Sequence, residues 1–224
     1  MKYLIANWKS TKNVNTAIEW VNEFNKLMKA NKEILKKLDE DSLKIIICPS
    51  YHLISLVKQK IIKHKNINLG SQDVSFFEQG NYTGEVSAQN LKELINYSIV
   101  GHSERRKYLK ETDNVIDQKV QILKDYSIEP ILCVRDENDL IPQGITFIAY
   151  EPVYAIGTGH NEDVDKIISS KNKIITDKNK IFIYGGSVNP ENMLEYSKSS
   201  EIQGFLLGNA SKDPNSFIAI ASKL

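Results

Sequence analysis

The stretch KIIICPSYHLISLVKQKIIK, residues 44–63, contains the unit from which the chain is built. It opens with a short apolar run, breaks at Pro49 and Ser50, and continues with apolar residues spaced three and four apart. A continuous apolar run is typical of a strand that is buried on both faces of a parallel sheet. The later spacing is typical of an amphipathic helix. This stretch therefore predicts a strand followed by a helix that covers it.

The same unit recurs along the whole chain. Apolar runs of strand length occupy residues 3–6, 44–48, 67–70, 97–100, 129–133, 145–150, 180–184 and 204–207. Segments with helical spacing lie between or after them, at residues 16–38, 51–63, 88–95, 115–126, 164–175, 190–198 and 214–222. Such alternation predicts an α/β protein with a closed (β/α)8 barrel, and a doubly wound open sheet is the structural alternative.

One of these units lacks room for its helix. Only residues 134–144 connect the strand that ends at Cys133 to the strand that begins at Ile145. A crossover that includes its helix needs at least about 10 to 12 residues, and Pro142 and Gly144 disfavour a helix interior. We expect the helix after the fifth strand to be truncated or missing, and the outer faces of the two strands to lose their cover.

The composition is that of a globular protein and narrows the classes of function. The 224 residues are 41% hydrophobic and 25% charged, which suits one barrel domain over residues 1–224. The net charge of +1 leaves no surplus of cations for nucleic acid. No apolar run is long enough for a membrane span, and residues 3–6 are too short for the core of a signal peptide. We therefore expect a cytoplasmic protein.

The two cysteines, Cys48 and Cys133, lie in apolar runs far apart in the sequence. Neither belongs to a CxxC pair, which argues against a disulfide framework and against a zinc site. We expect both to be small buried thiols.

Polar residues and glycines follow the ends of five predicted strands. Active sites of (β/α)8 barrels form at the carboxyl ends of the strands, so these residues are expected to meet at one mouth. The candidates are Asn7 and Lys9, His102 and Glu104, Glu151 with the glycine-containing segment 153–159, Gly185 with Gly186 and Ser187, and Gly208 with Asn209.

Three of these side chains are suited to acid–base chemistry. Glu151 precedes Pro152, which fixes the backbone, and a carboxylate partly removed from water there would have a raised pKa and could act as a base. His102 stands where a helix is expected to begin at Ser103, so its imidazole should stay neutral and donate to a developing oxyanion. Lys9 either extends into solvent or offers positive charge to an anionic substrate. The ordinary alternatives are a surface glutamate, a buried histidine and a solvated lysine.

The glycines after the last two strands indicate a phosphate site. Residues 185–187 and 208–209 can expose backbone N–H groups that no Cβ atom obstructs. Phosphate sites in barrels commonly use the loops after strands seven and eight. Glycines also simply form turns, but their placement after these two strands favours an anion site.

Five strings of the sequence together resemble one enzyme family. They are ANWK (6–9), GHSERR (101–106), AYEPV (149–153), AIGTG (155–159) and YGGSV (184–188). In this order, and spread over nearly the whole chain, they are similar to the triosephosphate isomerase family. That family has the TIM-barrel fold and is a standard example of catalysis by a glutamate base, a neutral histidine and a closing loop.

The resemblance implies an isomerase that interconverts dihydroxyacetone phosphate and D-glyceraldehyde 3-phosphate in glycolysis and gluconeogenesis. Glu151 would move the proton, His102 would polarise the carbonyl, and Lys9 would stabilise the enediolate. The other residues with implied roles are Asn7 and Glu104 beside these groups, and Gly157, Ser187, Gly208 and Asn209 around the phosphate. No metal or other cofactor is implied, and neither nucleic acid nor a membrane is expected as a partner.

The resemblance also implies a homodimer and a mobile lid. Residues 72–85 would hold the dimer through aromatic anchors, and Thr83 of the partner subunit would approach Asn7 and Lys9. Residues 152–158 would close over the substrate and exclude water, so that the enediolate does not eliminate phosphate. In the closed state, Ile156 and Leu206 would clamp apolar surface over Glu151.

The chain departs from the family pattern at the lid and the phosphate loop. Tyr154 stands where tryptophan is usual, and His160, Asn161 and Glu162 stand where Lys-Thr-Ala is common. Residues 134–136 read Val-Arg-Asp where the family usually has a hydrophobic residue, Gly and Glu. Asn209 replaces a second glycine, and because asparagine tolerates positive φ, we expect the anion site to survive.

Two other functions remain open. Another phosphate-binding barrel enzyme would share the glycine turns, but it would not be expected to combine Asn7-Trp8-Lys9 with His102 and Glu151. A catalytically weakened barrel retained as a binding or surface protein would keep the fold with a lid that no longer works.

Overall fold

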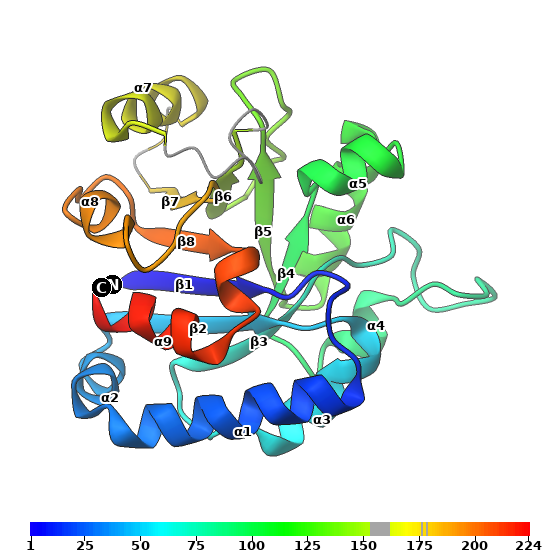
Figure 1. Ribbon diagram of the computed structural model, residues 1–224. Helices are drawn as coiled ribbons and strands as arrows, with labels where there is room; N and C mark the ends of the chain where they lie inside the picture. The colour runs from blue at the N-terminus through cyan, green and yellow to red at the C-terminus, as the bar shows by residue number, and fades with distance from the viewer. Residues whose placement is uncertain (153–161, 176, 178) are drawn as a thin grey trace.

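The computed structural model describes residues 1–152, 162–175, 177 and 179–224. Eight parallel strands pair in chain order, and β8 returns to β1 to close a barrel (Figure 1). They are β1 (Lys2–Asn7), β2 (Leu43–Cys48), β3 (Ile67–Ser71), β4 (Tyr97–Val100), β5 (Glu129–Val134), β6 (Phe147–Tyr150), β7 (Ile181–Tyr184) and β8 (Gly204–Leu207). The predicted (β/α)8 barrel is confirmed, in preference to the open sheet.

Helices surround the barrel in Figure 1. They are α1 (Val14–Ala30), α2 (Lys32–Asp39), α3 (Tyr51–Lys60), α4 (Ala88–Leu91), α5 (Ser103–Tyr108), α6 (Asp113–Asp125), α7 (Val164–Ile174), α8 (Met193–Ser197) and α9 (Pro214–Ser222), with a 3-10 turn, η1 (Asn209–Ser211). Within the described parts of the chain, none of them is long and apolar enough to cross a membrane.

The single helical segment expected over residues 16–38 is wrong, because two helices form there. Asn31 follows the last residue of α1, and its side chain accepts a hydrogen bond from the N–H of Ile34 at 3.0 Å. An asparagine that caps a new helix in this way competes with continuation of the old one. The chain therefore turns at Asn31 and starts α2.

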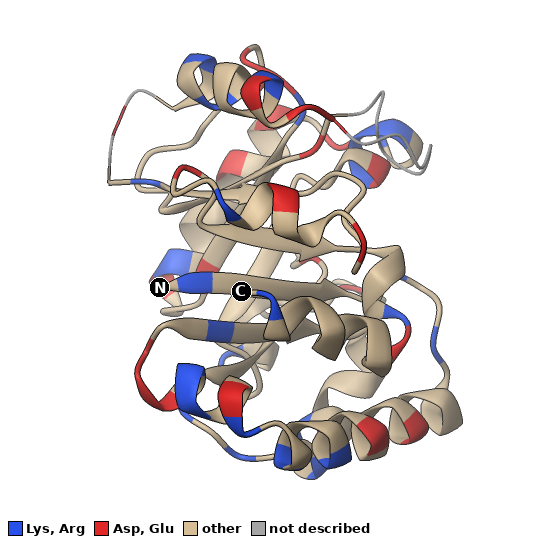
Figure 2. Cartoon of the chain, turned by 60° about the vertical axis from the view of Figure 1, so that its left-hand side comes forward, with Lys and Arg blue, Asp and Glu red and all other residues tan. Residues whose placement is uncertain are grey.

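The strands are apolar throughout because both of their faces are buried. In β2, Ile46 and Cys48 point into the barrel interior, whereas Ile45 and Ile47 belong to the apolar layer beneath the helices. Cys133 also lies in the inner layer, and both cysteines are free and buried, as expected. Most charged residues lie on helices and loops, while the strands are largely uncharged (Figure 2).

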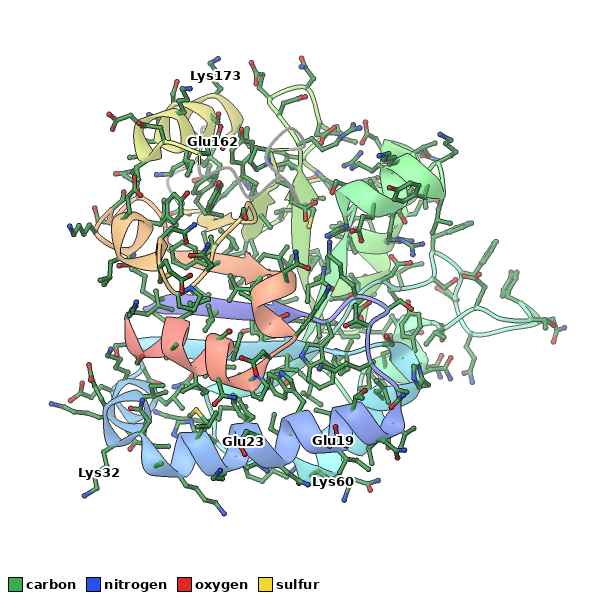
Figure 3. The ribbon with its side chains drawn as sticks, in the orientation of Figure 1. Glu19, Glu23, Lys32, Lys60, Glu162 and Lys173 are labelled. Carbon is green, nitrogen blue, oxygen red and sulfur yellow. The ribbon has the colours of Figure 1, made fainter. Side chains whose placement is uncertain are left out.

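Helix α1 shows how the outer layer is covered. Trp20, Val21 and Phe24 are at most 2% exposed and pack against the barrel layer, which contributes roughly 1.5 to 3 kcal/mol for each large apolar side chain. The charged Glu19 lies on the exposed side of the same helix, and Lys173 extends outward from α7 (Figure 3). The spacing of apolar residues three and four apart thus places them on the inner side of the helix and leaves the charged residues on the outer side.

No helix forms between β5 and β6, whose whole connection is described, so the predicted loss of that helix is confirmed. The expectation that the neighbouring strand faces lose their cover is wrong. Leu132, Val134 and Ile148 are 0% exposed. Ile145, only 3% exposed, and the partly buried Ile141 belong to the same apolar layer. The short connection therefore contributes apolar side chains to the same layer as these strand residues.

Candidate active site

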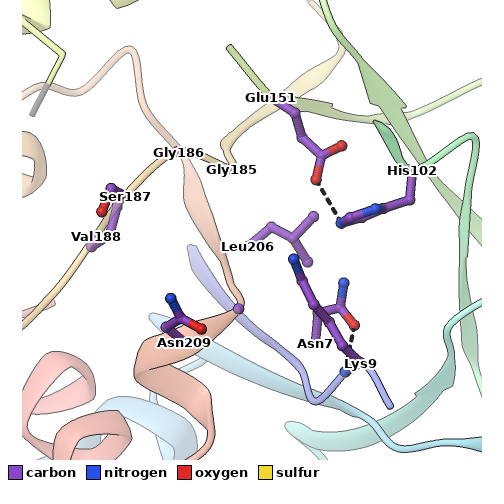
Figure 4. Close-up of a pocket in the computed structure, with 11 residues that line it drawn as sticks. Asn7, Lys9, His102, Glu151, Gly185, Gly186, Ser187, Val188, Leu206 and Asn209 are labelled. Atoms are coloured by element: carbon purple, nitrogen blue, oxygen red, sulfur yellow. Dashed lines mark hydrogen bonds and ion pairs between the residues drawn. The ribbon is translucent and has the colours of Figure 1, made fainter. Parts of the chain in front are cut away.

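One cavity of about 80 Å³ opens at the carboxyl ends of the strands, where the sequence predicts the site. Its lining residues are Asn7, Lys9, His102, Glu151, Gly185, Gly186, Ser187, Val188, Leu206, Gly208 and Asn209 (Figure 4). Glu104, the other described candidate, pairs with Lys9. The lid residues 153–158, Gly157 among them, lie outside the described residues, and so do the altered positions Tyr154, His160 and Asn161.

Lys9 is held from both its backbone and its side chain. Its φ of +50° is in the left-handed region that residues other than glycine rarely adopt. Its carbonyl accepts hydrogen bonds from Ser50 Oγ at 3.0 Å and Gln72 Nε2 at 2.9 Å, and its N–H donates to Asn7 Oδ1 at 3.1 Å. Lys9 Nζ lies 2.6 Å from Glu104 Oε1. These contacts maintain a strained backbone that fixes the ammonium group at the cavity wall.

His102 presents a single N–H donor inside the site. It caps the start of α5, where its Nδ1 accepts the backbone N–H of Glu104 at 3.2 Å. A nitrogen that accepts a hydrogen bond carries no proton, so the ring proton is assigned to Nε2. Nε2 lies 2.9 Å from Glu151 Oε1 (Figure 4). This geometry directs the Nε2–H group of His102 toward the carboxylate of Glu151.

Glu151 is a buried carboxylate, only 2% exposed, with a donor at each oxygen. His102 Nε2 approaches Oε1, and the N–H of Ser103 donates to Oε2 at 2.9 Å. Burial by itself would raise the pKa of Glu151, but the hydrogen bonds from His102 and from the amide of Ser103 outweigh it and hold that pKa below its usual value. The expected raised pKa is therefore wrong for this arrangement, in which the carboxylate is ionised.

The opposite wall of the cavity consists of backbone from the loops after β7 and β8. A Cβ atom on Gly186 would lie 2.2 Å from Tyr184 Oη, so this position lacks space for a side chain. One on Gly208 would lie 3.3 Å from Lys9 Cε, a tight contact that a small shift of the lysine side chain would relieve. Asn209, the first residue of η1, is not among the residues with positive φ. The tolerance of asparagine for positive φ is therefore not needed at position 209.

Two backbone N–H groups of this wall are already used. The N–H of Gly185 donates to the carbonyl of Tyr150 at 2.8 Å, and that of Val188 donates to the carbonyl of Gly186 at 3.0 Å. These bonds fix the loop after β7 and remove both groups from the set of anion donors. The expectation that the N–H of Gly185 is exposed to an anion is therefore wrong, whereas the candidates Ser187, Gly208 and Asn209 avoid these two positions.

The sequence argument missed several supports of the site. Gln72 Nε2 donates to the carbonyls of both Lys9 and Cys48, and Ser50 Oγ donates to Lys9. These contacts join residues that follow different strands, so a local sequence pattern cannot predict them. The sequence did contain one indication of the role of the Ser103 amide. A helix that starts at this residue leaves its N–H free to donate to an acceptor.

The site combines three side chains with different chemistry around one cavity. A carboxylate can remove a proton from a carbon atom, while an N–H donor and an ammonium group stabilise the negative charge that develops on oxygen. Among the described residues, no three His, Cys, Asp or Glu side chains gather in a way that could hold a metal ion. The fold and site define a barrel enzyme that performs acid–base chemistry on a small anionic substrate.

Comparisons with known proteins narrow this class. The family model described as "Triosephosphate isomerase" matches residues 2–224. Proteins named triosephosphate isomerase from Dictyoglomus thermophilum and Aquifex aeolicus are 36% and 35% identical, over 96% and 98% of each chain. Another from Thermus thermophilus is 34% identical over 96% of this chain and 95% of its own length. The chain belongs to the triosephosphate isomerase family.

Proposed function

We propose that the chain is a triosephosphate isomerase that interconverts dihydroxyacetone phosphate and D-glyceraldehyde 3-phosphate. The observation that carries this proposal is the meeting of Lys9, His102 and Glu151 at one cavity in a chain of this family. Nothing favours the alternative of a weakened barrel retained for binding. The substrate's own carbonyl acidifies the C–H bond, so the proposed reaction needs no cofactor.

In the proposed reaction, the carbonyl oxygen lies between Lys9 and His102. Glu151 removes a proton from the neighbouring carbon, and the bonding electrons move onto the oxygen to give the enediolate. The ammonium group and the Nε2–H donor stabilise that charge. His102 Nε2 then gives its proton to this oxygen and takes up the hydroxyl proton of the neighbouring oxygen. Glu151 returns its proton to the other carbon, which completes the isomerisation.

Glu151 has to leave its present hydrogen bonds before it can act. One of its oxygens accepts from His102 and the other from Ser103. In the proposed step, the Nε2–H of His102 has to donate to the substrate instead. Breaking these contacts removes what lowers the pKa of the carboxylate, whereas the burial that raises it remains. We infer that Glu151 becomes a stronger base as it moves toward the substrate.

The phosphate is proposed to bind the backbone wall. Ser187, Gly208 and Asn209 would donate N–H groups, with Gly157 of the lid as a further donor carried over from the family. Residues 152–158 would close over the bound substrate, and Ile156 and Leu206 would then cover Glu151. A dianion held there also experiences the positive charge of Lys9, which strengthens the attraction in a site that excludes water.

We further propose that the active form is a cytoplasmic homodimer in which residues 1–224 act as one domain. Figure 1 shows the loop after β3 projecting from the barrel. In this loop the rings of Phe77 and Tyr82 stack at 4.1 Å, and Tyr82 is 45% exposed. Exposed aromatic residues of this kind are enriched in interfaces. Thr83 of the partner subunit would then approach Lys9, and neither nucleic acid nor a membrane is proposed as a partner.

Two measurements test the function and the assembly. In a coupled assay, the purified chain should convert glyceraldehyde 3-phosphate to dihydroxyacetone phosphate, and Glu151→Gln should serve as the matched inactive control. Equal rates for the two proteins would contradict the function. Sedimentation at micromolar concentration should give a dimer, and a single species near 25.5 kDa would contradict the assembly.

A further inference from the structure

The shortened connection between β5 and β6 holds a buried carboxylate that the proposed reaction does not use. Asp139 is 8% exposed and accepts the backbone N–H of Arg135 at 2.7 Å. Nε and Nη2 of the same arginine donate to the Asp139 carboxylate at 3.0 and 2.5 Å. Burial by itself would raise the pKa of Asp139, but the hydrogen bonds from Arg135 outweigh it and keep the carboxylate ionised.

One chain of contacts leads from Asp139 to His102. Arg106 Nη1 lies 3.8 Å from Asp139 Oδ1, and Arg106 Nε donates to the carbonyl of Gly101 at 2.9 Å. Gly101 has a φ of +68° and directly precedes His102, so its carbonyl belongs to the peptide that leads into the histidine. Arg106 also pairs with Asp113 at 2.6 Å. A guanidinium fixed by two carboxylates holds the backbone from which the imidazole projects.

A second chain of contacts leads from Asp139 to Glu151. The N–H of Arg135, which Asp139 accepts, directly follows Val134, the last residue of β5. The carbonyl of Val134 accepts the backbone N–H of Glu151 at 2.8 Å. The side chain of Asp139 therefore anchors the end of the strand that holds the backbone of Glu151.

We propose that Asp139, in the connection that lacks its helix, is a positioning residue. It fixes the positions of the His102 and Glu151 side chains relative to each other. The proposal rests on the proposed function. A displacement of about 1 Å in reacting groups can lower a rate by about a hundredfold. The loops that would bind phosphate follow β7 and β8 and lie opposite His102 in Figure 4. The effect should therefore fall on kcat, with little change in KM.

The test compares two substitutions of matched chemistry. Asp139→Asn keeps the size of the side chain and an acceptor oxygen but removes the charge. Its kcat per folded active site should fall by about tenfold or more, with KM within about twofold, and Asp139→Glu should recover most of the loss. The control is Asp41→Asn, because Asp41 also accepts from a side chain, Asn66 Nδ2 at 2.5 Å, but precedes β2 at the other end of the barrel. Its kcat should stay unchanged.

A spectroscopic measurement separates positioning from general stabilisation. The NMR signals of the His102 ring should move in Asp139→Asn and stay in place in Asp41→Asn, whether or not the enzyme turns over. A fall in kcat with unmoved His102 signals would overturn the proposal, as would a kcat within twofold of wild type. If wild type shows no isomerase activity but the ring signals still move, the proposed function fails and the positioning stands.

A second variant covers the case in which Asp139→Asn does not fold. Arg135→Gln removes the guanidinium from the same contact at a side chain that is 41% exposed, so the loss of packing is small. Its kcat should fall by about threefold or more, with a shift of the His102 signals in the same direction. Unchanged signals in this variant would equally overturn the proposal.

Discussion

The two walls of the active-site cavity are built from different materials. On one wall, Lys9, His102 and Glu151 present side chains that are fixed by contacts of 2.6 to 3.2 Å. On the other wall, residues 185–188 and 208–209 contribute mostly backbone, and a Cβ atom has no room at Gly186. The first wall therefore depends on the identity of each side chain, whereas the second depends on space and on the direction of N–H groups.

The largest expected effect is on the side-chain wall. Glu151→Gln keeps the shape of the side chain but removes the base, so kcat should fall by on the order of 10² to 10⁴, with a much smaller change in KM. Steady-state kinetics in both reaction directions measure both constants. A variant that retains more than about a tenth of wild-type kcat would show that Glu151 is not the base.

A change on the backbone wall should mainly raise KM, in contrast to the loss of kcat expected for the side-chain wall. Gly186→Ala places a Cβ atom 2.2 Å from the hydroxyl of the fully buried Tyr184, so the loop after β7 has to shift. We expect KM to rise by about tenfold and stability to fall by about 1 to 3 kcal/mol, as for other overpacked positions. Binding of inorganic phosphate should weaken in parallel with KM.

A glycine away from the site provides the control for that loss of stability. In Gly144→Ala, the new Cβ atom meets the flexible end of Lys124 at a backbone φ of +78°, in the connection between β5 and β6. Stability should fall while KM stays within about twofold of wild type, because no anion donor moves. An equal rise of KM in both variants would mean that the two walls are not independent.

The pH dependence of stability tests the ionised state of Glu151. Its pKa in the folded protein is held below the usual value, while an unfolded glutamate titrates near about 4.3. A lowered folded pKa stabilises the protein above the unfolded pKa, and this contribution is lost as the pH falls through the folded pKa. Between about pH 6 and pH 3, wild type should lose more free energy of unfolding than Glu151→Gln. Urea titrations at each pH give the free energy of unfolding of both proteins. If it changes equally with pH in the two, Ser103 and His102 do not lower the pKa of Glu151.

The barrel could be predicted from sequence because strands that are buried on both faces appear in the sequence as continuous apolar runs. Ile45 to Cys48 in β2 are apolar at every position, since inward and outward residues are both covered. The convergence of Lys9, His102 and Glu151 followed from the topology alone, because parallel strands of a barrel bring their carboxyl ends together.

The features that sequence reasoning missed depend on contacts between distant residues. The lowered pKa of Glu151 requires the amide of Ser103, which only the closed barrel brings to 2.9 Å. Leu132 and Ile148 are buried although no helix follows β5, and Ile145, at the end of a loop that carries no helical pattern, belongs to the same apolar layer. The break at Asn31 depends on a side chain that prefers to cap α2. Local periodicity reports none of these interactions.

The smallest expected effect tests how far the backbone wall tolerates changes in side chain. Asn209 is exposed, lines the cavity and has no positive φ, so Asn209→Gly should retain the backbone N–H that we assign to the phosphate. The extra freedom of glycine should lower stability by about 0.5 to 1 kcal/mol, and KM should stay within about twofold. Asn209→Ala separates the two causes, because alanine lacks the carboxamide but restricts the backbone as asparagine does. If KM rises more than about fivefold in both variants, the carboxamide itself binds the substrate, and this wall, like the other, depends on a side chain.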